Sequence, residues 1–442
     1  MEIIDLVKAG GFQCDCGSYH RASLEDLIIE AGALRRLPEL IGRYGGKKIF
    51  VVTDRREYEA AGKKVCKILA QADIPCSVYV FEEEHLEPDE QAVGKAVLHY
   101  DSTCDLILGV GSGVINDIGK ILANLTGNTY FIAATAPSMD GYASATSSMV
   151  ADGLKVSLNS VCPKVIIGDL DVLCQAPANL LGSGLGDMVA KYISICEWRI
   201  AHELVGEKYC PAIAQMVREA VEKCVTHAKG LANCEPGAVA AVMEGLVVTG
   251  IAMSYAGLSR PASGMEHYFS HVWDMRGLEF GTPVDTHGIQ CGIGTLLSMK
   301  VYDVIRRITP DKEKAMIFVK DFNINDWNDQ LKMFLGKAAD AMIEGEKREG
   351  KYDQVKHAAR LERIMEIWPL LKQIIEEEIP SYENVENALN MVGVPTRPEQ
   401  IGLSREEVVI AFQMTKDIRD KYIGSRLLWD LGLLEDVAGK LG

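Results

Sequence analysis

The chain has 442 residues, enough for two or three domains with substantial buried cores. Hydrophobic residues make up 48% of it and charged residues 24%, which excludes a disordered, collagen-like or coiled-coil protein. The formal net charge of −16 repels phosphate backbones and anionic lipid surfaces, so the composition argues against a nucleic-acid partner.

The N-terminal segment MEIIDLVKAGGF lacks the basic region and apolar stretch of a signal peptide, and no run of 18 apolar residues occurs. The twelve cysteines are scattered, which is typical of reduced thiols rather than of a disulfide framework. We therefore expect a cytoplasmic protein without membrane insertion.

The segment CDCGSYH (14–20) offers Cys14, Cys16 and His20 as ligands of a zinc ion. One ligand of the usual four is missing, and the C-x-C spacing differs from the common C-x₂-C. The alternative is a pair of thiols without a metal.

Four apolar, β-rich runs follow, at 47–54, 76–83, 105–110 and 129–137, each separated by enough residues for a crossover helix. Beyond Pro177 the long segments 187–204, 211–232 and 236–258 have helical spacing. The pattern predicts an α/β domain with a mostly parallel sheet over residues 1–178, followed by an all-α domain over 179–442.

Two segments of the second half carry local signals. The charged stretch 343–353 contains two glycines, which favours a solvated helix end or loop. Ser404, followed by Glu407, predicts a capping box that begins a helix running toward Tyr422.

A glycine-rich segment, DLILGVGSGVINDIGK (105–120), places Gly109, Gly111 and Gly113 directly after an apolar strand and before a helix. Glycines let a backbone approach a phosphate closely, and the N–H groups at a helix start attract anions. The third glycine of G-x-G-x-x-G is replaced by Val114, and the loop follows the third strand, so the fingerprint differs from that of a Rossmann domain. A tight turn without a ligand is the alternative, and Asp117 could simply complement the helix dipole.

Asp54 ends the first strong strand, where a carboxylate can accept both hydroxyls of an adenosine ribose and so favour NAD. The adjacent Arg55 and Arg56 could instead neutralise the 2′-phosphate of NADP. A surface aspartate that starts a turn is the remaining alternative.

A carboxylate and three histidines lie in glycine-rich surroundings: Asp187, His267, His271 and His287. The spacing of four between His267 and His271 puts both imidazoles on one helix face. Two imidazoles and one carboxylate suit Zn, Fe, Ni or Mn with open positions for a substrate oxygen, but spacing alone does not choose among the histidines. Buried structural histidines are the alternative.

The combination of GVGSGVINDIGK, TAPSMDGYASATS, GSGLGDMVAK, SRPASGMEHYFSH and THGIQCGIGTL resembles the bacterial sn-glycerol-1-phosphate dehydrogenases. That family is related to the iron-containing alcohol dehydrogenases, glycerol dehydrogenase and dehydroquinate synthase. These motifs span residues 45–300, the ending GVPTRPEQIGLSREEV (393–408) is also familial, and residues 310–390 carry no motif that we can place. The resemblance implies a cofactor domain followed by a helical domain that binds metal and substrate, with the active site in the cleft between them.

By the same resemblance, Asp187, His267 and His287 are the metal ligands, whereas His271 and Asp140 face the substrate and act in catalysis. Asp187 is also expected to contact the substrate. The dinucleotide-binding residues implied are Asp54, Gly113, Val114, Ile115, Asn116, Asp117, Thr135, Ala136, Pro137, Ser138 and Ser144.

The implied reaction is the reversible reduction of dihydroxyacetone phosphate to sn-glycerol 1-phosphate with NAD(H) or NADP(H) and one divalent metal, Zn or Ni, with Fe also accepted. Arg260 and Lys191 are candidate partners of the substrate phosphate, although either could pair with a structural carboxylate. A homodimer is expected by resemblance alone. The alternatives are a glycerol dehydrogenase that acts on an uncharged polyol, a metal-dependent lyase or hydrolase without a dinucleotide, and a nucleotide-binding protein without catalysis.

Overall fold

The computed structural model describes residue 7 and residues 10–441, and the chain forms two compact units. The first contains the described residues up to Met188, with Ala212–Ser259 and Met391–Gly393. The second contains Val189–Pro211, Arg260–Asn390 and the described residues from Val394 onward. The helical stretch Ala212–Ser259 therefore packs as part of the first unit. The predicted division into a dinucleotide-binding domain (1–178) and a metal-binding domain (179–442) stays a prediction.

The first unit is built around a six-stranded sheet in the order β3-β10-β7-β6-β4-β5, in which all neighbouring strands are parallel. The strands are β3 (Asp26–Glu30), β4 (Ile49–Asp54), β5 (Cys76–Phe81), β6 (Leu106–Gly111), β7 (Thr129–Ala134) and β10 (Val165–Asp169). The four predicted runs correspond to β4, β5, β6 and β7, and the predicted fold class is confirmed. The sequence missed β3 and β10, because runs of five residues do not distinguish a strand from a helix segment.

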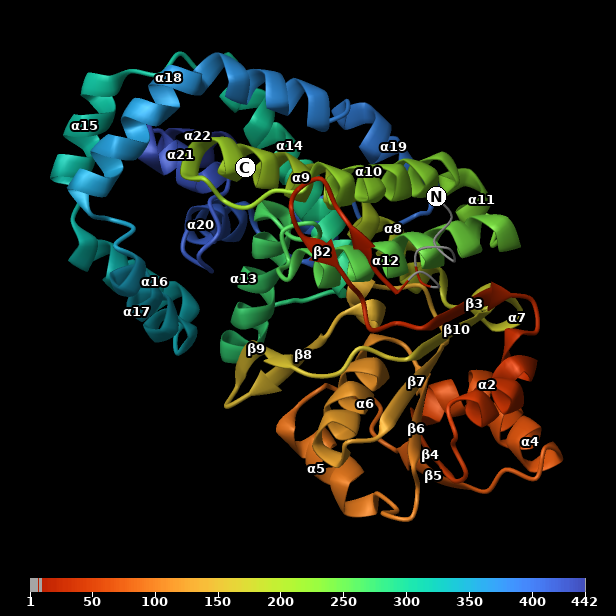
Figure 1. Ribbon diagram of the computed structural model, residues 1–442. Helices are drawn as coiled ribbons and strands as arrows, with labels where there is room; N and C mark the ends of the chain where they lie inside the picture. The colour runs from red at the N-terminus through yellow and green to blue at the C-terminus, as the bar shows by residue number, and fades with distance from the viewer. Residues whose placement is uncertain (1–6, 8–9, 442) are drawn as a thin grey trace. The chain divides into compact units, whose positions relative to one another are not determined.

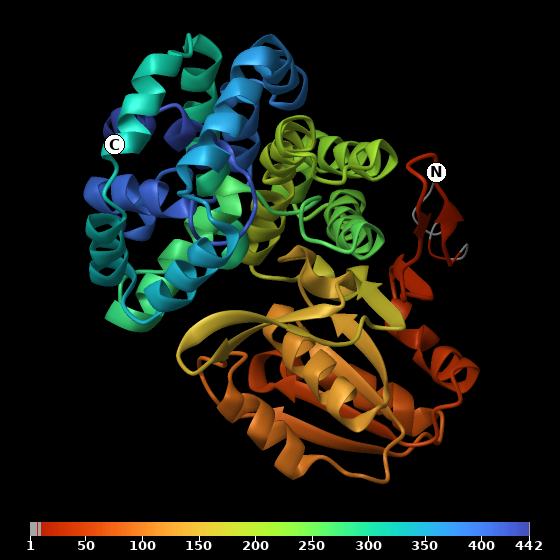
Figure 2. The ribbon, with the colours of Figure 1, turned by 60° about the vertical axis from the view of Figure 1, so that its left-hand side comes forward.

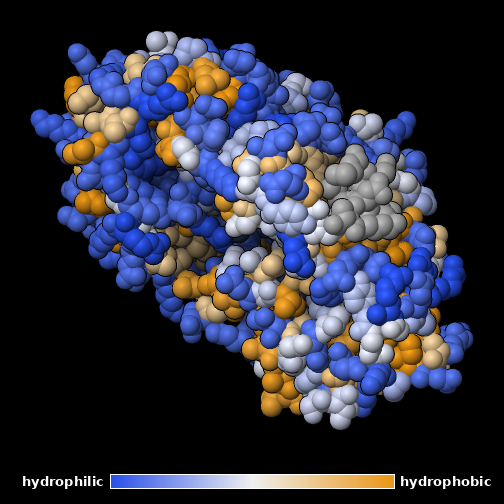
Figure 3. Space-filling view, viewed as in Figure 1, coloured by the Kyte–Doolittle hydropathy of each residue, from blue (hydrophilic) through white to orange (hydrophobic). Residues whose placement is uncertain are grey.

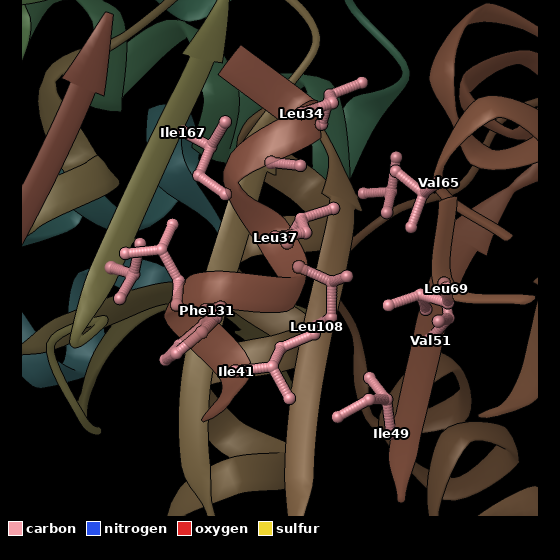
Figure 4. Packing of buried hydrophobic residues seen from close by; sticks show 14 of the residues in the cluster. Leu34, Leu37, Ile41, Ile49, Val51, Val65, Leu69, Leu108, Phe131 and Ile167 are labelled. Carbon is pink, nitrogen blue, oxygen red and sulfur yellow. The ribbon is translucent and has the colours of Figure 1, made fainter. Parts of the chain in front are cut away.

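Helices cover both faces of this sheet (Figure 1). One face is covered by η1 (Ala33–Arg36), α2 (Leu37–Arg43) and a continuous run of α3 (Arg55–Glu57), η2 (Tyr58–Gly62) and α4 (Lys63–Gln71). The other face is covered by α5 (Glu90–His99) and α6 (Gly113–Thr126). Figure 4 shows the core on the first face, where Leu37 and Ile41 of α2 meet Leu108 and Phe131 of the sheet. Removing such side chains from water is the main source of stability here.

The order of the strands reverses between β4 and β6, because the chain passes from β4 to β5 on one side and then to β6 on the other. In open parallel sheets, ligands bind beyond the carboxyl ends of the strands at such a switch point. Val52 of β4 is opposite Gly109 of β6, so Asp54 and Gly111 end their strands at the same level. The fold therefore gives both residues the position that a dinucleotide site needs.

The remaining elements of the first unit are two hairpins and several helices. The hairpins are β1 (Phe12–Gln13) with β2 (Tyr19–His20), and β8 (Thr146–Ala151) with β9 (Leu154–Asn159). The helices are η3 (Asp140–Ala143), α7 (Leu170–Leu173), α8 (Ala178–Val189), α10 (Pro211–Thr226), α11 (Ala228–Ala232) and α12 (Pro236–Ala256). α12 is long and apolar enough to cross a membrane by length and composition, but 67% of its apolar window is buried inside the protein, as in a core helix.

The described residues of the second unit form helices and the loops between them, without a strand (Figures 1 and 2). Its elements are α9 (Lys191–Val205), α13 (Met265–Phe280), α14 (His287–Arg307), α15 (Lys312–Asp321), α16 (Ile324–Leu335), α17 (Ala338–Glu349), α18 (Gln354–Glu378), α19 (Tyr382–Met391), η4 (Pro398–Ile401), α20 (Arg405–Thr415), α21 (Gly424–Asp430) and α22 (Leu434–Leu441). The predicted helical texture is confirmed, and helices fill the stretch 310–390 in which no motif was found.

Two local predictions for this unit need correction. The capping box of Ser404 and Glu407 is present, but α20 ends at Thr415 rather than near Tyr422. The charged stretch 343–353 does contain the helix end at Glu349, yet Glu346 within it is only 3% exposed. Burial, and then the Asp417 carboxylate, raises the pKa of Glu346 to about 9.

Hydrophilic residues predominate on the face of the molecule shown in Figure 3, with hydrophobic residues in small separate patches. This distribution agrees with the excess of acidic residues in the sequence.

Candidate functional site

The glycine-rich segment forms the turn from β6 into α6. Gly109 and Gly111 lie inside β6 rather than in the loop, which corrects the sequence interpretation. A Cβ on Gly109 would meet the Tyr130 hydroxyl at 2.4 Å, so this glycine makes room for the neighbouring strand rather than for a ligand. The loop itself is Ser112 and Gly113, and the N–H groups at the start of α6 follow directly.

Three predicted nucleotide segments converge on one side chain that the sequence analysis missed. Asp54 at the end of β4, Ser112 beyond β6 and Thr135 beyond β7 each influence the pKa of the Glu57 carboxyl group. Burial raises the pKa of the Glu57 carboxyl group, and the negative charge of Asp54 adds to this rise. The only signal in the sequence was its place three residues after Asp54 in DRRE.

Asp54 also has a local structural role. Its Oδ1 accepts a hydrogen bond from the Glu57 N–H at 2.8 Å and so caps the helix that follows β4. Asp54 therefore begins a turn, as the structural alternative predicted. This role does not exclude a contact with a ribose, because a carboxylate can accept further hydrogen bonds.

Asn116, Asp117 and Ser144 belong to a buried network centred on Lys120. The Lys120 ammonium contacts Asp117 Oδ1 at 3.0 Å, the Gly141 carbonyl at 3.1 Å and Ser144 Oγ at 3.3 Å. Asn116 Nδ2 donates to the same Gly141 carbonyl at 3.2 Å. Lys120 thus ties α6 to the turn at residues 140–144, a link for which the sequence gave no signal.

The buried residues Thr135, Ala136, Pro137 and Ser138 follow β7 outside any helix or strand. Ser183 of α8 donates a hydrogen bond to the Ser138 carbonyl at 3.0 Å. A Cβ on Gly184 would lie 1.9 Å from the Pro137 carbonyl oxygen, so only a glycine allows α8 to approach this closely. The glycines of GSGLGD therefore serve the packing that places Asp187.

The structure brings Asp187, His267 and His287 together. Their ligand atoms and the thiol of Cys291 all lie within 4.8 Å of one another. Asp187 belongs to α8, His267 to α13, and His287 and Cys291 to α14. Cys291 was missed, although its spacing of four from His287 on one helix was readable.

His271 lies outside this group. Its ring centroid is 6.4 Å from that of His287, whereas the centroids of His267 and His287 are 5.0 Å apart. The structure thus separates the two histidines of HxxxH, which the spacing could not do.

Hydrogen bonds orient the two imidazoles of the group. His267 Nδ1 lies 2.9 Å from Glu266 Oε1, and His287 Nδ1 lies 3.2 Å from Ser270 Oγ. In both rings, Nε2 is therefore the nitrogen left to face an ion, which is the usual arrangement of metal-binding histidines. Burial, and then the Lys191 ammonium, hold the pKa of His267 well below its ordinary value, so the ring is neutral as a ligand must be.

Asp187 is fully buried, and its Oδ2 accepts a hydrogen bond from the Asp140 N–H at 2.8 Å. Ligands of a tetrahedral ion lie roughly 3–4 Å apart, because metal–ligand distances are about 2.0–2.3 Å. The buried carboxylate, the two oriented imidazoles and their mutual distances fit a divalent transition metal. Glu266 Oε2 beside them is buried and without a hydrogen-bond partner among the described residues, and burial, followed by the charge of Glu197, raises the pKa of this carboxyl group to about 8.

The two candidate cations for a phosphate have different surroundings. Arg260 is 1% exposed and makes a salt bridge to Glu207 at 2.5 Å. It therefore pairs with a structural carboxylate, which was the alternative to binding the substrate phosphate. Lys191 is fully buried and donates to the Ala262 carbonyl at 3.2 Å. Lys421, which the sequence analysis missed, donates to the Ser263 carbonyl at 2.6 Å, and both ammonium groups act electrostatically on His267.

Known proteins resemble this chain along its whole length. Residues 28–177 match the family described as iron-containing alcohol dehydrogenase. A relative from Halalkalibacterium halodurans named "Glycerol-1-phosphate dehydrogenase [NAD(P)+]" is 33% identical over 304 residues, which are 68% of this chain and 76% of the relative. A protein of the same name from Bacillus licheniformis is 27% identical over 99% of this chain and 97% of its own length.

Among solved structures, glycerol dehydrogenase from Schizosaccharomyces pombe matches with a TM-score of 0.59 and 16% identity, over 95% of this chain and 90% of that one. This likeness shows that the two share a fold. The sequence relatives show that the chain belongs to the glycerol-1-phosphate dehydrogenase family.

Proposed function

We propose that this chain is an NAD(P)-dependent glycerol-1-phosphate dehydrogenase that reduces dihydroxyacetone phosphate reversibly to sn-glycerol 1-phosphate. The observation that carries the proposal is the grouping of Asp187, His267 and His287 in a chain whose relatives bear that enzyme's name. An oxidoreductase of this kind needs a Lewis acid, a dinucleotide and a proton donor, and each has candidate residues here.

Asp187, His267 and His287 would hold the ion, which we propose to be zinc or nickel, with iron also accepted by this ligand set. Such an ion, when bound, polarises a ketone and stabilises negative charge on its oxygen. Glu266 and Ser270 fix the orientation of the two imidazoles through their Nδ1 atoms. Asp140 holds the Asp187 carboxylate through its backbone N–H, and its side chain is the proposed substrate contact.

His271 is the proposed proton donor to the oxygen that becomes the C2 hydroxyl of the product. An imidazole takes up and releases a proton near neutral pH, which suits a reversible reaction. Its position next to His287, but outside the ligand group, supports this role.

The dinucleotide is proposed to bind beyond the carboxyl ends of β4, β6 and β7. The residues are those expected from the sequence: Asp54, Gly113, Val114, Ile115, Asn116, Asp117, Thr135, Ala136, Pro137, Ser138 and Ser144. The switch point of the sheet and the convergence of three segments on Glu57 support this placement. Asp54 favours NAD(H), Arg55 and Arg56 favour NADP(H), and the relatives' name covers both.

The substrate is a dianion at neutral pH, and the chain carries a net charge of −16. Local positive charge must therefore offset the long-range repulsion. Lys191 supplies a buried ammonium group that acts on His267, and we propose that it attracts the phosphate together with Lys421, whose pKa burial lowers to about 7.

The test compares two ketones after removal of metal by a chelator and addition of Zn, Ni or Fe. We expect NADH or NADPH oxidation with dihydroxyacetone phosphate, and a kcat/KM about 10²-fold lower with dihydroxyacetone, because the charged contacts are lost. Asp187→Asn should abolish the activity, whereas Asp171→Asn, at an exposed carboxylate on α7, should leave it unchanged.

Equal rates with both ketones would favour a polyol dehydrogenase instead. If NADH and NADPH fluorescence were unchanged on titration of the metal-loaded protein, both dehydrogenase functions would be excluded, and a metal-dependent lyase or hydrolase would be the better explanation.

We further propose that the enzyme acts on this phosphorylated triose in the cytoplasm, as a homodimer, without nucleic acid or membrane insertion. The acidic composition supports the absence of nucleic acid. Light scattering during size-exclusion chromatography should give twice the mass of one chain.

A further inference from the structure

A second group of metal-binding side chains lies at the N-terminal hairpin. Strands β1 and β2 pair Phe12 with His20, and the residues between them turn tightly. Gly17 N donates to the Cys14 carbonyl and Cys14 N to the Ser18 carbonyl, both at 3.0 Å, and Gly17 has a φ of +83°. A glycine suits this left-handed conformation, so the turn in CDCGS is specified by its sequence.

The fourth ligand that this segment lacked is supplied from far along the chain. One ligand atom each from Cys14, Cys16, His20 and Cys210 lie within 4.8 Å of one another. Cys210 directly precedes α10 in the chain. At the N-terminal end of a helix, a thiolate is favoured by the helix dipole.

His20 is oriented by a backbone group. Its Nδ1 lies 2.9 Å from the Tyr255 carbonyl oxygen, which can only accept a hydrogen bond. The proton of the neutral ring is therefore on Nδ1, and Nε2 presents a lone pair toward Cys16 Sγ at 3.2 Å. In metal-binding histidines, the ring nitrogen that does not bind the metal commonly donates a hydrogen bond to a backbone carbonyl, as Nδ1 does here.

The surroundings of the group are largely shielded from water. Cys14 is 8% exposed, and His20 and Cys210 are each 3% exposed. The rings of Phe12 and Tyr255 lie 5.2 and 5.8 Å from the His20 ring. The hairpin lies against α12 in the ribbon views (Figures 1 and 2).

We propose that Cys14, Cys16, His20 and Cys210 bind a structural zinc ion in a tetrahedral Cys₃His site. Three sulfurs and one imidazole, without a carboxylate, are a closed ligand set that selects zinc over hard cations. On binding, Zn²⁺ replaces the three thiol protons, which pass to solvent, so no oxidant or reductant is needed. This site shares no residue with the group at Asp187 and does not depend on the proposed reaction.

The site has a structural purpose that follows from the size of the hairpin. Strands of two residues each are too short to be stable by themselves. An ion bound by Cys14, Cys16, His20 and Cys210 would hold the hairpin of residues 12–20 in its folded conformation.

The experiment measures metal content and ligand type in the full-length protein purified under reducing conditions. Chelation is expected to remove the metal at Asp187 and to leave one tightly held zinc per chain. Cys16→Ser, at the most exposed of the four ligands, should lose that zinc, while the matched control Cys234→Ser, a partly exposed cysteine outside the group, should keep it. Asp187→Asn should also keep it, which separates this proposal from the proposed function.

Replacement of the tightly held zinc by Co²⁺ in the wild-type protein provides a second readout that does not depend on a variant's folding. We expect the thiolate-to-cobalt charge-transfer absorption and the intense visible bands of tetrahedral coordination, with both lost in Cys16→Ser. A wild-type protein that holds no zinc after chelation, a cobalt spectrum without thiolate bands, or a disulfide among these cysteines in the reduced preparation would each overturn the proposal.

Discussion

His267 and His271 stand one helical turn apart on α13, and their surroundings assign them different roles. His267 is 4% exposed, is held by Glu266 and shares a ligand group with Asp187 and His287. His271 is half-buried and is not one of the four residues of that group. The proposed division between a ligand and a proton donor rests on this difference.

The two alanine variants should therefore behave differently. His267→Ala is expected to lose the chelatable metal and the activity together, because one of three protein ligands is removed. His271→Ala should keep the metal and lose roughly 10²–10⁴-fold in kcat, the usual contribution of a general acid. Metal analysis and NADH oxidation on the same preparations check this, and metal loss from both variants would contradict the division of roles.

Cys162 illustrates how a single buried group links stability to pH. Burial raises the pKa of its thiol from the ordinary 9.0 to about 12, while Lys120 opposes the shift. In the unfolded chain the thiol ionises near pH 9, but in the folded chain it stays protonated, so the folded state binds more protons between pH 9 and 12. The free energy of unfolding must therefore fall as the pH rises through this window.

Removal of the thiol should flatten this dependence. The contribution of one such group is at most about 1.4 kcal/mol per pH unit. Urea unfolding of wild type and Cys162→Ala on either side of pH 9 measures it, and identical slopes above pH 9 would show that this thiol is not the cause.

At the scale of elements, α8 is positioned by backbone proximity rather than by a large side chain. Gly184 faces the Pro137 carbonyl so closely that a Cβ would lie 1.9 Å from it, and backbone cannot move aside as a flexible side chain can. The same helix carries Asp187 three residues later. Its approach to the segment beyond β7 therefore depends on one missing methyl group.

Gly184→Ala should destabilise the protein by roughly 1–3 kcal/mol and weaken dinucleotide binding, because α8 and residues 135–138 must separate. Gly94→Ala is the matched control, since Gly94 lies within α5 with nothing within 4 Å of its Cβ position. That change should stabilise the chain by about 0.4–1 kcal/mol, because alanine is the better helix former. Chemical unfolding and NADH titration of both variants check the pair, and a Gly184→Ala protein as stable as Gly94→Ala would contradict the argument.

At the scale of the whole molecule, the proposed dinucleotide site predicts a ligand-dependent stability. A ligand that binds only the folded chain stabilises it by about 2.7 kcal/mol at 100 times its Kd. For a chain of 442 residues this corresponds to a rise in Tm of about 3 °C. Thermal unfolding with increasing NADH or NADPH measures it, dihydroxyacetone serves as a small uncharged control, and a Tm that is independent of both dinucleotides would speak against the site.

The sequence by itself determined the parallel sheet, the helical second half and the separate segments that carry the candidate site. Strands β4 to β7 are long apolar runs with clear separators, and the capping box at Ser404 is a local signal that needs no tertiary contact. His267 and Asp187 could be proposed as functional residues from the sequence because each lies in a glycine-rich segment.

Only the tertiary structure decided which residues meet. Packing between distant segments decides that His267, and not His271, joins the group with Asp187, and that Cys291 belongs to it as well. It also decides that Cys210 lies beside Cys14. The same holds for Glu346, which is charged in the sequence and buried in the fold. Local patterns record the conformation of neighbouring residues, whereas contacts across the chain depend on how the elements pack, and neither spacing nor composition encodes that packing directly.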